Sequence, residues 1–169
     1  MNYYNAVLRP PQELAEALTL FAQENFSDIA DGYCLSDRVL SHITLCQFKA
    51  NEMPDISFDT IQKSPEPMAY NVGIGDGMHE GYVWSEITIK PEPWLYHLHE
   101  YVKNKLSSYD VEILTKNYTP HQTFCRLPES QKDFAEAIKI PDMFLQQHNG
   151  WTFEVGYSDA NGQYMGRKT

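Results

Sequence analysis

Two short stretches with the same pattern constrain this chain more than any other feature. Residues 41–46 read SHITLC and residues 120–125 read PHQTFC, so each stretch has a histidine, a threonine two residues later and a cysteine two beyond that. Both lie in runs rich in β-branched and apolar residues, which are typical of strands. Residues two apart on a strand share a face, so each stretch presents a histidine beside a threonine. The repetition predicts two imidazoles and two hydroxyls that face a common groove.

The segments around these two stretches have the patterns of an α+β protein. Helical spacing of apolar residues predicts helices at residues 11–26 and 91–106, both opened by prolines, and a third helix from Ser130 with Phe134 facing inward. The glycines of residues 73–77 are followed by a strand pattern rather than a helix, so they indicate a hairpin turn and not a phosphate-binding loop. Besides the motif strand at residues 39–48 and the one after Pro120, alternation predicts strands at residues 3–8, 56–58, 68–74, 82–90, 111–114, 151–157 and 163–167.

Each half of the chain carries one His-x-Thr strand, and the order of elements in the two halves is loosely similar. At 169 residues we expect a single domain over residues 1–169, which is long enough to bury roughly 70% of its unfolded surface. We therefore predict a bilobal α+β fold. Two antiparallel sheets related by an approximate two-fold axis would flank a central groove, with the helices packed outside.

The net charge and the cysteine content limit which partners the protein can bind and in which compartment it is expected. The formal net charge of −10 argues against binding to long nucleic acid, because such binding depends on Lys and Arg neutralising phosphates, but it allows a small or terminal nucleotide in a local pocket. No apolar run approaches the ~18 residues of a membrane helix, and the chain does not begin like a signal peptide. Three cysteines without CxxC spacing, Cys34, Cys46 and Cys125, favour reduced thiols. We expect a cytoplasmic monomer that does not bind membranes.

A pair of histidines across a groove is suited to acid–base chemistry on a phosphodiester. His titrates near neutral pH, so one neutral imidazole can accept a proton from the attacking group while a protonated one donates to the leaving oxygen. His42 and His121 are the candidates for this pair. Thr44 and Thr123, one strand step away, can donate hydrogen bonds to the phosphate oxygens as charge builds up in the transition state.

A metal site is the rival interpretation, because His42, Cys46, His121 and Cys125 are zinc ligands by type. A histidine and a cysteine four residues apart on a strand are separated by roughly 13 Å, whereas zinc requires ligands at about 2.0–2.3 Å. We therefore predict no metal and no cofactor. The other histidines lack such partners and are expected on loops or helix surfaces: His79, His97, His99 and His148.

The two motifs resemble the paired His-x-Thr/Ser motifs of the two-histidine (2H) phosphoesterase superfamily, which includes RNA 2′,3′-cyclic phosphodiesterases once called 2′-5′ RNA ligases. The resemblance extends over nearly the whole chain. It includes Pro120 before the second histidine, Arg126 after it, and the closing hairpin around Gly162 and Tyr164.

This resemblance implies a hydrolase of the cyclic phosphodiesterase type with a bilobal fold. It would open a 2′,3′-cyclic phosphate or a 2′-5′ linkage, without a metal, in a small nucleotide or an RNA end during RNA processing. His42 and His121 would be the acid–base pair, and Thr44 and Thr123 would hold the phosphate.

Four further residues are candidates for binding the substrate. Single bases are often held by stacking, and Phe48, Tyr118 and Trp84 can either supply an aromatic wall or belong to the core. Phe48 is included because regular alternation puts it on the same face as His42. Arg126 can pair with phosphate if a bulge or strand end turns it toward His121. Two alternatives stay open: a non-catalytic module that binds a nucleotide or RNA end in the same groove, and a metal-dependent hydrolase.

Overall fold

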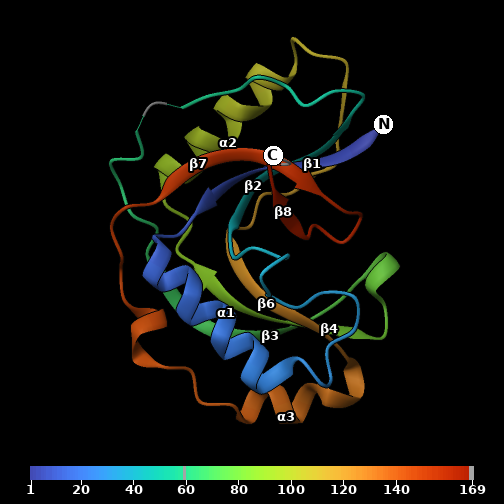
Figure 1. Cartoon of the computed structure of the whole chain (residues 1–169), viewed down its shortest axis with the longest axis vertical. Helices are drawn as coiled ribbons and strands as arrows, with labels where there is room; N and C mark the ends of the chain where they lie inside the picture. Colours follow the sequence, from blue (N-terminus) through green and yellow to red (C-terminus); the bar gives the residue numbers. More distant parts are fainter. Residues whose placement is uncertain (59, 168–169) are drawn as a thin grey trace.

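The computed structural model describes residues 1–58 and 60–167, and in these residues eight strands form two antiparallel sheets beside three α-helices (Figure 1). The predicted α+β class is confirmed. In chain order the elements are β1 (Asn2–Arg9), α1 (Gln12–Phe26), β2 (Ile43–Ala50), β3 (Pro67–Ile74), β4 (Tyr82–Ile89), α2 (Pro93–Leu106), β5 (Val111–Ile113), β6 (His121–Pro128), α3 (Lys132–Ala137), β7 (Thr152–Ser158) and β8 (Tyr164–Gly166).

The two motifs lie in different sheets. The five-stranded sheet has the order β5-β2-β1-β7-β8 and contains the first motif strand, β2. The three-stranded sheet has the order β3-β4-β6 and contains the second, β6. Helix α2 packs on β2, while α1 packs against β6 and α3 against β3 (Figure 1). In the described part of the chain, no helix is long and apolar enough to cross a membrane.

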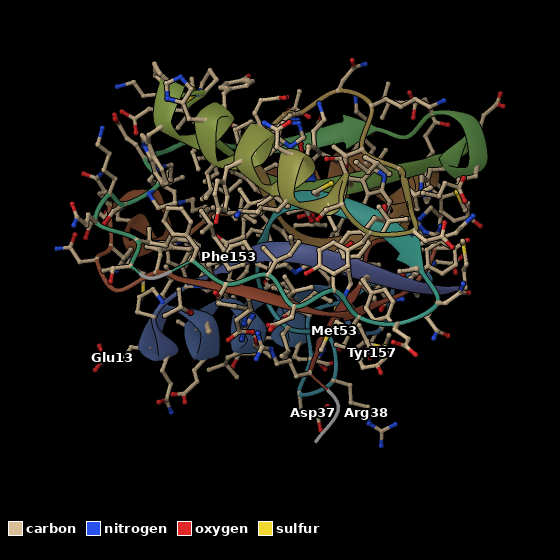
Figure 2. All side chains as sticks on the ribbon, turned by 90° about the horizontal axis from the view of Figure 1, so that it is seen from above. Glu13, Asp37, Arg38, Met53, Phe153 and Tyr157 are labelled. Carbon is tan, nitrogen blue, oxygen red and sulfur yellow. The ribbon has the colours of Figure 1, made fainter. Side chains whose placement is uncertain are left out.

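One continuous hydrophobic core joins the sheets and helices. Its largest aromatic group surrounds Phe124 of β6, whose ring centroid lies 5.2 Å from that of Phe21 and 5.9 Å from that of Phe144. Because Phe21 belongs to the apolar face of α1, this group fastens the helix to the three-stranded sheet. Charged side chains such as Glu13, Asp37 and Arg38 point away from the molecule into solvent (Figure 2).

Three sequence predictions about elements are wrong. The strand expected from residue 39 begins at Ile43, because the backbone N–H of Val39 donates to the Ser36 hydroxyl and forms a turn there. Residues 56–58 form no strand. Phe134 is 50% exposed and Ala135 is buried instead, because α3 begins only at Lys132, after a separate 3₁₀ turn.

Both motif strands contain a β-bulge directly after the motif threonine. On β2, Cys46 lies opposite Ala6 and Thr44 lies opposite Val7, so Leu45 is an extra residue. On β6, Cys125 lies opposite Ser85 and Thr123 opposite Glu86, which leaves Phe124 as the extra residue. A one-residue shift moves all following side chains to the other face of a strand. The regular alternation assumed from the sequence therefore ends at each threonine.

Hydrogen bonds hold the backbone of both bulges. The carbonyl of Leu45 accepts from Nδ1 of His99 at 2.6 Å, and the carbonyl of Phe124 accepts from the N–H of Leu35 at 2.9 Å. His99 is only 5% exposed and stacks on Tyr118, with ring centroids 4.5 Å apart and planes 4° apart. The prediction that His99 lies on a helix surface is therefore wrong, because its ring is buried against β2, where it donates to the carbonyl of Leu45.

We expect Phe124→Ala to destabilise the protein by about 3–5 kcal/mol, the usual range for removing a buried phenylalanine ring. Phe134→Ala is a matched control that should change the free energy of unfolding by less than about 0.5 kcal/mol, because Phe134 is half exposed. Urea denaturation of the two variants measures both values. Equal losses would contradict the assignment of Phe124 as the centre of the aromatic group.

Candidate functional site

A cavity of about 380 Å³ lies between the two sheets. Its walls come from β2, β3, β4 and β6, and from the connections at residues 115–119 and 161–162. The four residues predicted as catalytic all line it: His42, Thr44, His121 and Thr123. The structure therefore brings together the two motifs, which are 79 residues apart in the sequence.

The two histidines are held in the same way. Nδ1 of His42 lies 2.7 Å from the carbonyl oxygen of Leu40, and Nδ1 of His121 lies 2.7 Å from the carbonyl oxygen of Thr119. A carbonyl oxygen only accepts hydrogen bonds, so Nδ1 carries the hydrogen in each ring. In the neutral form, Nε2 of each ring is then left with its lone pair for chemistry.

A buried hydrogen bond joins the two motifs directly. Nε2 of Gln122, the residue between His121 and Thr123, donates to the hydroxyl of Ser41 at 2.8 Å, and both side chains are buried. Ser41 directly precedes His42. This contact fixes the position of one histidine relative to the other and was not found from the sequence.

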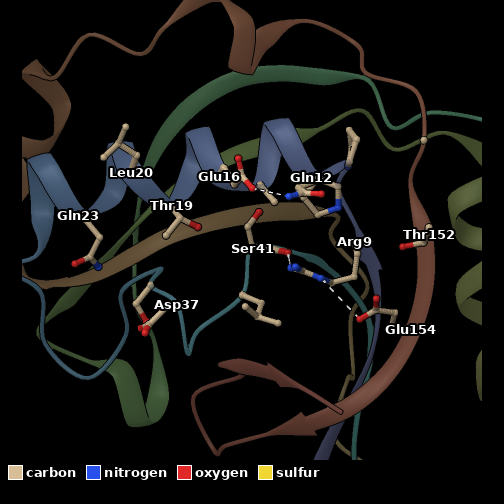
Figure 3. A pocket seen from close by; sticks show the side chains of 16 residues that line it. Arg9, Gln12, Glu16, Thr19, Leu20, Gln23, Asp37, Ser41, Thr152 and Glu154 are labelled. Atoms are coloured by element: carbon tan, nitrogen blue, oxygen red, sulfur yellow. Dashed lines mark hydrogen bonds and ion pairs between the residues drawn. The ribbon is translucent and has the colours of Figure 1, made fainter. Parts of the chain in front are cut away.

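Arg9 contacts the backbone just before His42, and Figure 3 shows its side chain between Ser41 and Glu154. Its guanidinium donates to the carbonyl of Ser41 and lies 3.8 Å from the carboxylate of Glu154. These residues line a second cavity of about 690 Å³ between α1 and the segment at residues 36–41, which His42 does not line. The contacts of Arg9 hold the backbone at Ser41, directly before His42.

The electrostatic surroundings of His42 favour its neutral form. Burial lowers the pKa of His42 to about 4. The hydrogen bond to the Leu40 carbonyl opposes this shift, while the charges of Arg9 and His121 add to it. At neutral pH the imidazole of His42 is therefore uncharged and able to accept a proton.

Of the four predicted substrate-binding residues, two line the cavity. Trp84 on β4 is partly exposed there, and its ring meets Tyr33 edge-on at a centroid distance of 5.5 Å. Tyr118 also lines the cavity, but it is only 9% exposed, and its hydroxyl has no hydrogen-bond partner among the described residues.

Phe48 and Arg126 do not line the cavity. The bulge at Leu45 turns Phe48 into the core, where it stacks on Tyr4, so its predicted place on the face of His42 is wrong. Gln47 lines the cavity in its place.

The bulge that the Arg126 prediction required is present, and Arg126 lies opposite Trp84 on β4. Its guanidinium is nevertheless occupied by protein groups, because Nε donates to the carbonyl of Asp31 at 2.8 Å and Nη1 lies 3.4 Å from Oδ1 of Asn161. Gly32, with a φ of +73°, allows the guanidinium to approach this closely, since a Cβ there would lie 2.5 Å from Nη2. The predicted contact of Arg126 with phosphate is not built into this arrangement.

Sequence reasoning missed a carboxylate in the cavity. Glu86 of β4 lies opposite Thr123, and its Oε2 is 3.9 Å from Nε2 of His121. Alternation on β4 was the available signal, because Glu86 is two residues from Trp84 and shares its face.

Cys46 and Cys125 are fully buried free thiols, and burial raises the pKa of Cys46 to about 11. Within residues 1–58 and 60–167, no three His, Cys, Asp or Glu side chains are grouped so that they hold a metal ion.

No protein-family model matches the chain, and no curated protein or solved structure matches it either. What the cavity does must therefore be inferred from its own residues.

We expect the stability of the protein to fall as the pH drops from 6.5 to 4. Because the pKa of His42 is lower in the folded state, the unfolded chain binds more protons in this range, and the difference corresponds to about 3 kcal/mol. His42→Asn keeps a donor for the Leu40 carbonyl but does not titrate, so its loss of stability should be smaller. Urea unfolding at several pH values measures both slopes. Identical slopes would contradict a buried, neutral His42.

Proposed function

We propose that the chain is a phosphodiesterase that opens a 2′,3′-cyclic phosphate or a 2′-5′ linkage in a small nucleotide or an RNA end, without a metal ion. The observation that carries this proposal is the matched setting of His42 and His121 in one cavity. Each ring is bonded through Nδ1 to a carbonyl two residues before it, and each has a threonine two residues after it.

Two such imidazoles supply what phosphodiester hydrolysis needs. One removes a proton from water as the oxygen attacks phosphorus, and the other gives a proton to the ribose oxygen as the bond to phosphorus breaks. Thr44 and Thr123 donate hydrogen bonds to the non-bridging oxygens, where negative charge grows in the transition state. The partly exposed ring of Trp84 offers a face for a base.

The proposal includes a two-lobed arrangement with an approximate two-fold axis through the cavity, each lobe contributing one motif strand. The β-bulge at the same place in β2 and β6 supports it. The free thiols are compatible with the cytoplasmic setting that we propose, in which the protein acts as a monomer.

The test is a panel of substrates incubated with the protein in the presence and in the absence of EDTA: 2′,3′-cyclic nucleotides, a 2′-5′ dinucleotide and RNA ending in a 2′,3′-cyclic phosphate. Chromatography resolves the products. Hydrolysis of at least one of them in EDTA supports the proposal. Binding without turnover would identify a non-catalytic nucleotide- or RNA-end-binding module instead, and activity that EDTA abolishes would identify a metal-dependent hydrolase.

We expect His42→Ala and His121→Ala each to lower kcat by about 10²–10⁴-fold, because each removes one proton-transfer group. His97→Ala is the control, since His97 lies exposed on α2 and does not line the cavity. Steady-state kinetics in EDTA measures the effect. Full activity of both cavity variants would rule out the acid–base pair.

We expect Thr44→Val and Thr123→Val to lower kcat by about 10²-fold, because each loses one hydrogen bond to the developing charge. Valine keeps the shape of threonine, so the fold should remain. Circular dichroism checks the fold, and kinetics on the same substrate measures kcat. Unchanged kcat in both variants would contradict the role of the hydroxyls.

A further inference from the structure

Cys34 and Cys125 are free thiols that lie opposite each other on neighbouring extended segments. Cys34 belongs to the connection between α1 and β2, and it forms an isolated antiparallel bridge with Cys125 of β6. The backbone N–H one residue after Cys34 donates to the carbonyl one residue before Cys125, at 2.9 Å. The N–H one residue after Cys125 donates to the carbonyl one residue before Cys34, also at 2.9 Å. The cysteines themselves are therefore a non-hydrogen-bonded pair.

The geometry of such a pair suits a disulfide. In an antiparallel, non-hydrogen-bonded pair the Cα atoms lie about 4.5 Å apart, and the two side chains are on the same face. A disulfide joins Cα atoms that are about 4.4–6.8 Å apart. Cys34 and Cys125 can therefore be linked without a large movement of the backbone. The third cysteine, Cys46, lies in the five-stranded sheet opposite Ala6 of β1.

The two thiols differ in how easily a reagent reaches them. Cys34 is partly exposed, and its Sγ has uncharged contacts: the Gln23 amide donates to it at 3.7 Å, and its S–H points to the Ala22 carbonyl at 3.9 Å. Cys125 is fully buried, so a reagent meets Cys34 first. Burial raises the pKa of Cys34 to about 11 and also raises that of Cys125, so both are thiols at neutral pH and react slowly.

We propose that Cys34 and Cys125 form a modification site, at which a small-molecule disulfide such as oxidised glutathione converts the pair into a disulfide between the two segments. The Cys34 thiolate attacks one sulfur of the reagent, whose S–S bond breaks, and a mixed disulfide forms as one thiolate leaves. The Cys125 sulfur then attacks Sγ of Cys34, and the second thiolate leaves. The two cysteines lose two protons and two electrons, and the reagent gains them as two thiols.

The link would reinforce a contact that the β6 bulge already uses. Leu35, next to Cys34, donates its N–H to the carbonyl of Phe124, the extra residue of the bulge after Thr123. Cys34 and Cys125 are 91 residues apart in the sequence, and a disulfide that closes a long loop restricts the unfolded chain strongly. The oxidised protein is therefore expected to keep its fold and to unfold at a higher temperature.

Peptide mapping tests the link directly, because trypsin separates the three cysteines into residues 1–38, 39–49 and 117–126. The protein is incubated with oxidised glutathione at about pH 8.5, where the thiolate fraction is larger, and free thiols are then blocked with N-ethylmaleimide in urea. Mass spectrometry without reductant should show residues 1–38 joined to 117–126, with 39–49 blocked. Dithiothreitol should reverse the link, and Cys34→Ala should not form it. Three blocked cysteines, a link through residues 39–49, or glutathione retained on Cys34 would each overturn the inference.

Thermal unfolding measures the consequence of the link. The Tm of oxidised wild type should exceed that of the reduced protein by about 5–15 °C. Cys46→Ala is the matched control and should show the same rise over its own reduced form, whereas Cys34→Ala should show none. A linked protein without a higher Tm would overturn the inference, because the bond would then strain the backbone. Neither measurement uses catalysis, so the substrate panel decides the proposed phosphodiesterase function separately.

Discussion

One buried hydrogen bond links the two motifs of the candidate site: the amide of Gln122 on β6 donates to the hydroxyl of Ser41, just before β2. Both residues are next to a motif histidine, so the contact ties the backbone at one imidazole to the backbone at the other. Buried polar groups cost free energy unless they are paired, so this bond also favours one alignment of the sheets over others. The cavity between the sheets depends on that alignment.

The β-bulges explain why each motif presents its histidine and threonine to the cavity while the following cysteine enters the core. A regular strand would have continued the same face through Cys46 and Phe48. The extra residue at Leu45 reverses the faces, so that Gln47 reaches the cavity and Phe48 fills the core. Each bulge carbonyl has a hydrogen-bond donor, from His99 in one case and from Leu35 in the other.

Much of this arrangement follows from local sequence patterns. The spacing in the two motifs predicted that His42, Thr44, His121 and Thr123 meet, and the helix at Gln12–Phe26 follows its apolar stripe. Phe48 was placed wrongly because the alternation does not continue through Leu45 and Cys46, where two apolar residues in succession mark the extra residue of the bulge. Glu86 was overlooked because a lone acidic residue on a strand resembles any solvated one until the strand beside it is known. Gln122 lies on β6 and Ser41 lies in the connection just before β2, so their contact depends on tertiary alignment.

The central claim is that the two imidazoles drive attack of water on a cyclic phosphodiester. Hydrolysis of a 2′,3′-cyclic nucleotide in H₂¹⁸O with EDTA, followed by mass spectrometry of the product, tests it most directly. We expect one ¹⁸O atom in the phosphate of a nucleoside monophosphate, formed by wild type and lost in the double variant His42→Ala/His121→Ala. Unchanged substrate with wild type, or equal labelling by the double variant, would contradict the claim.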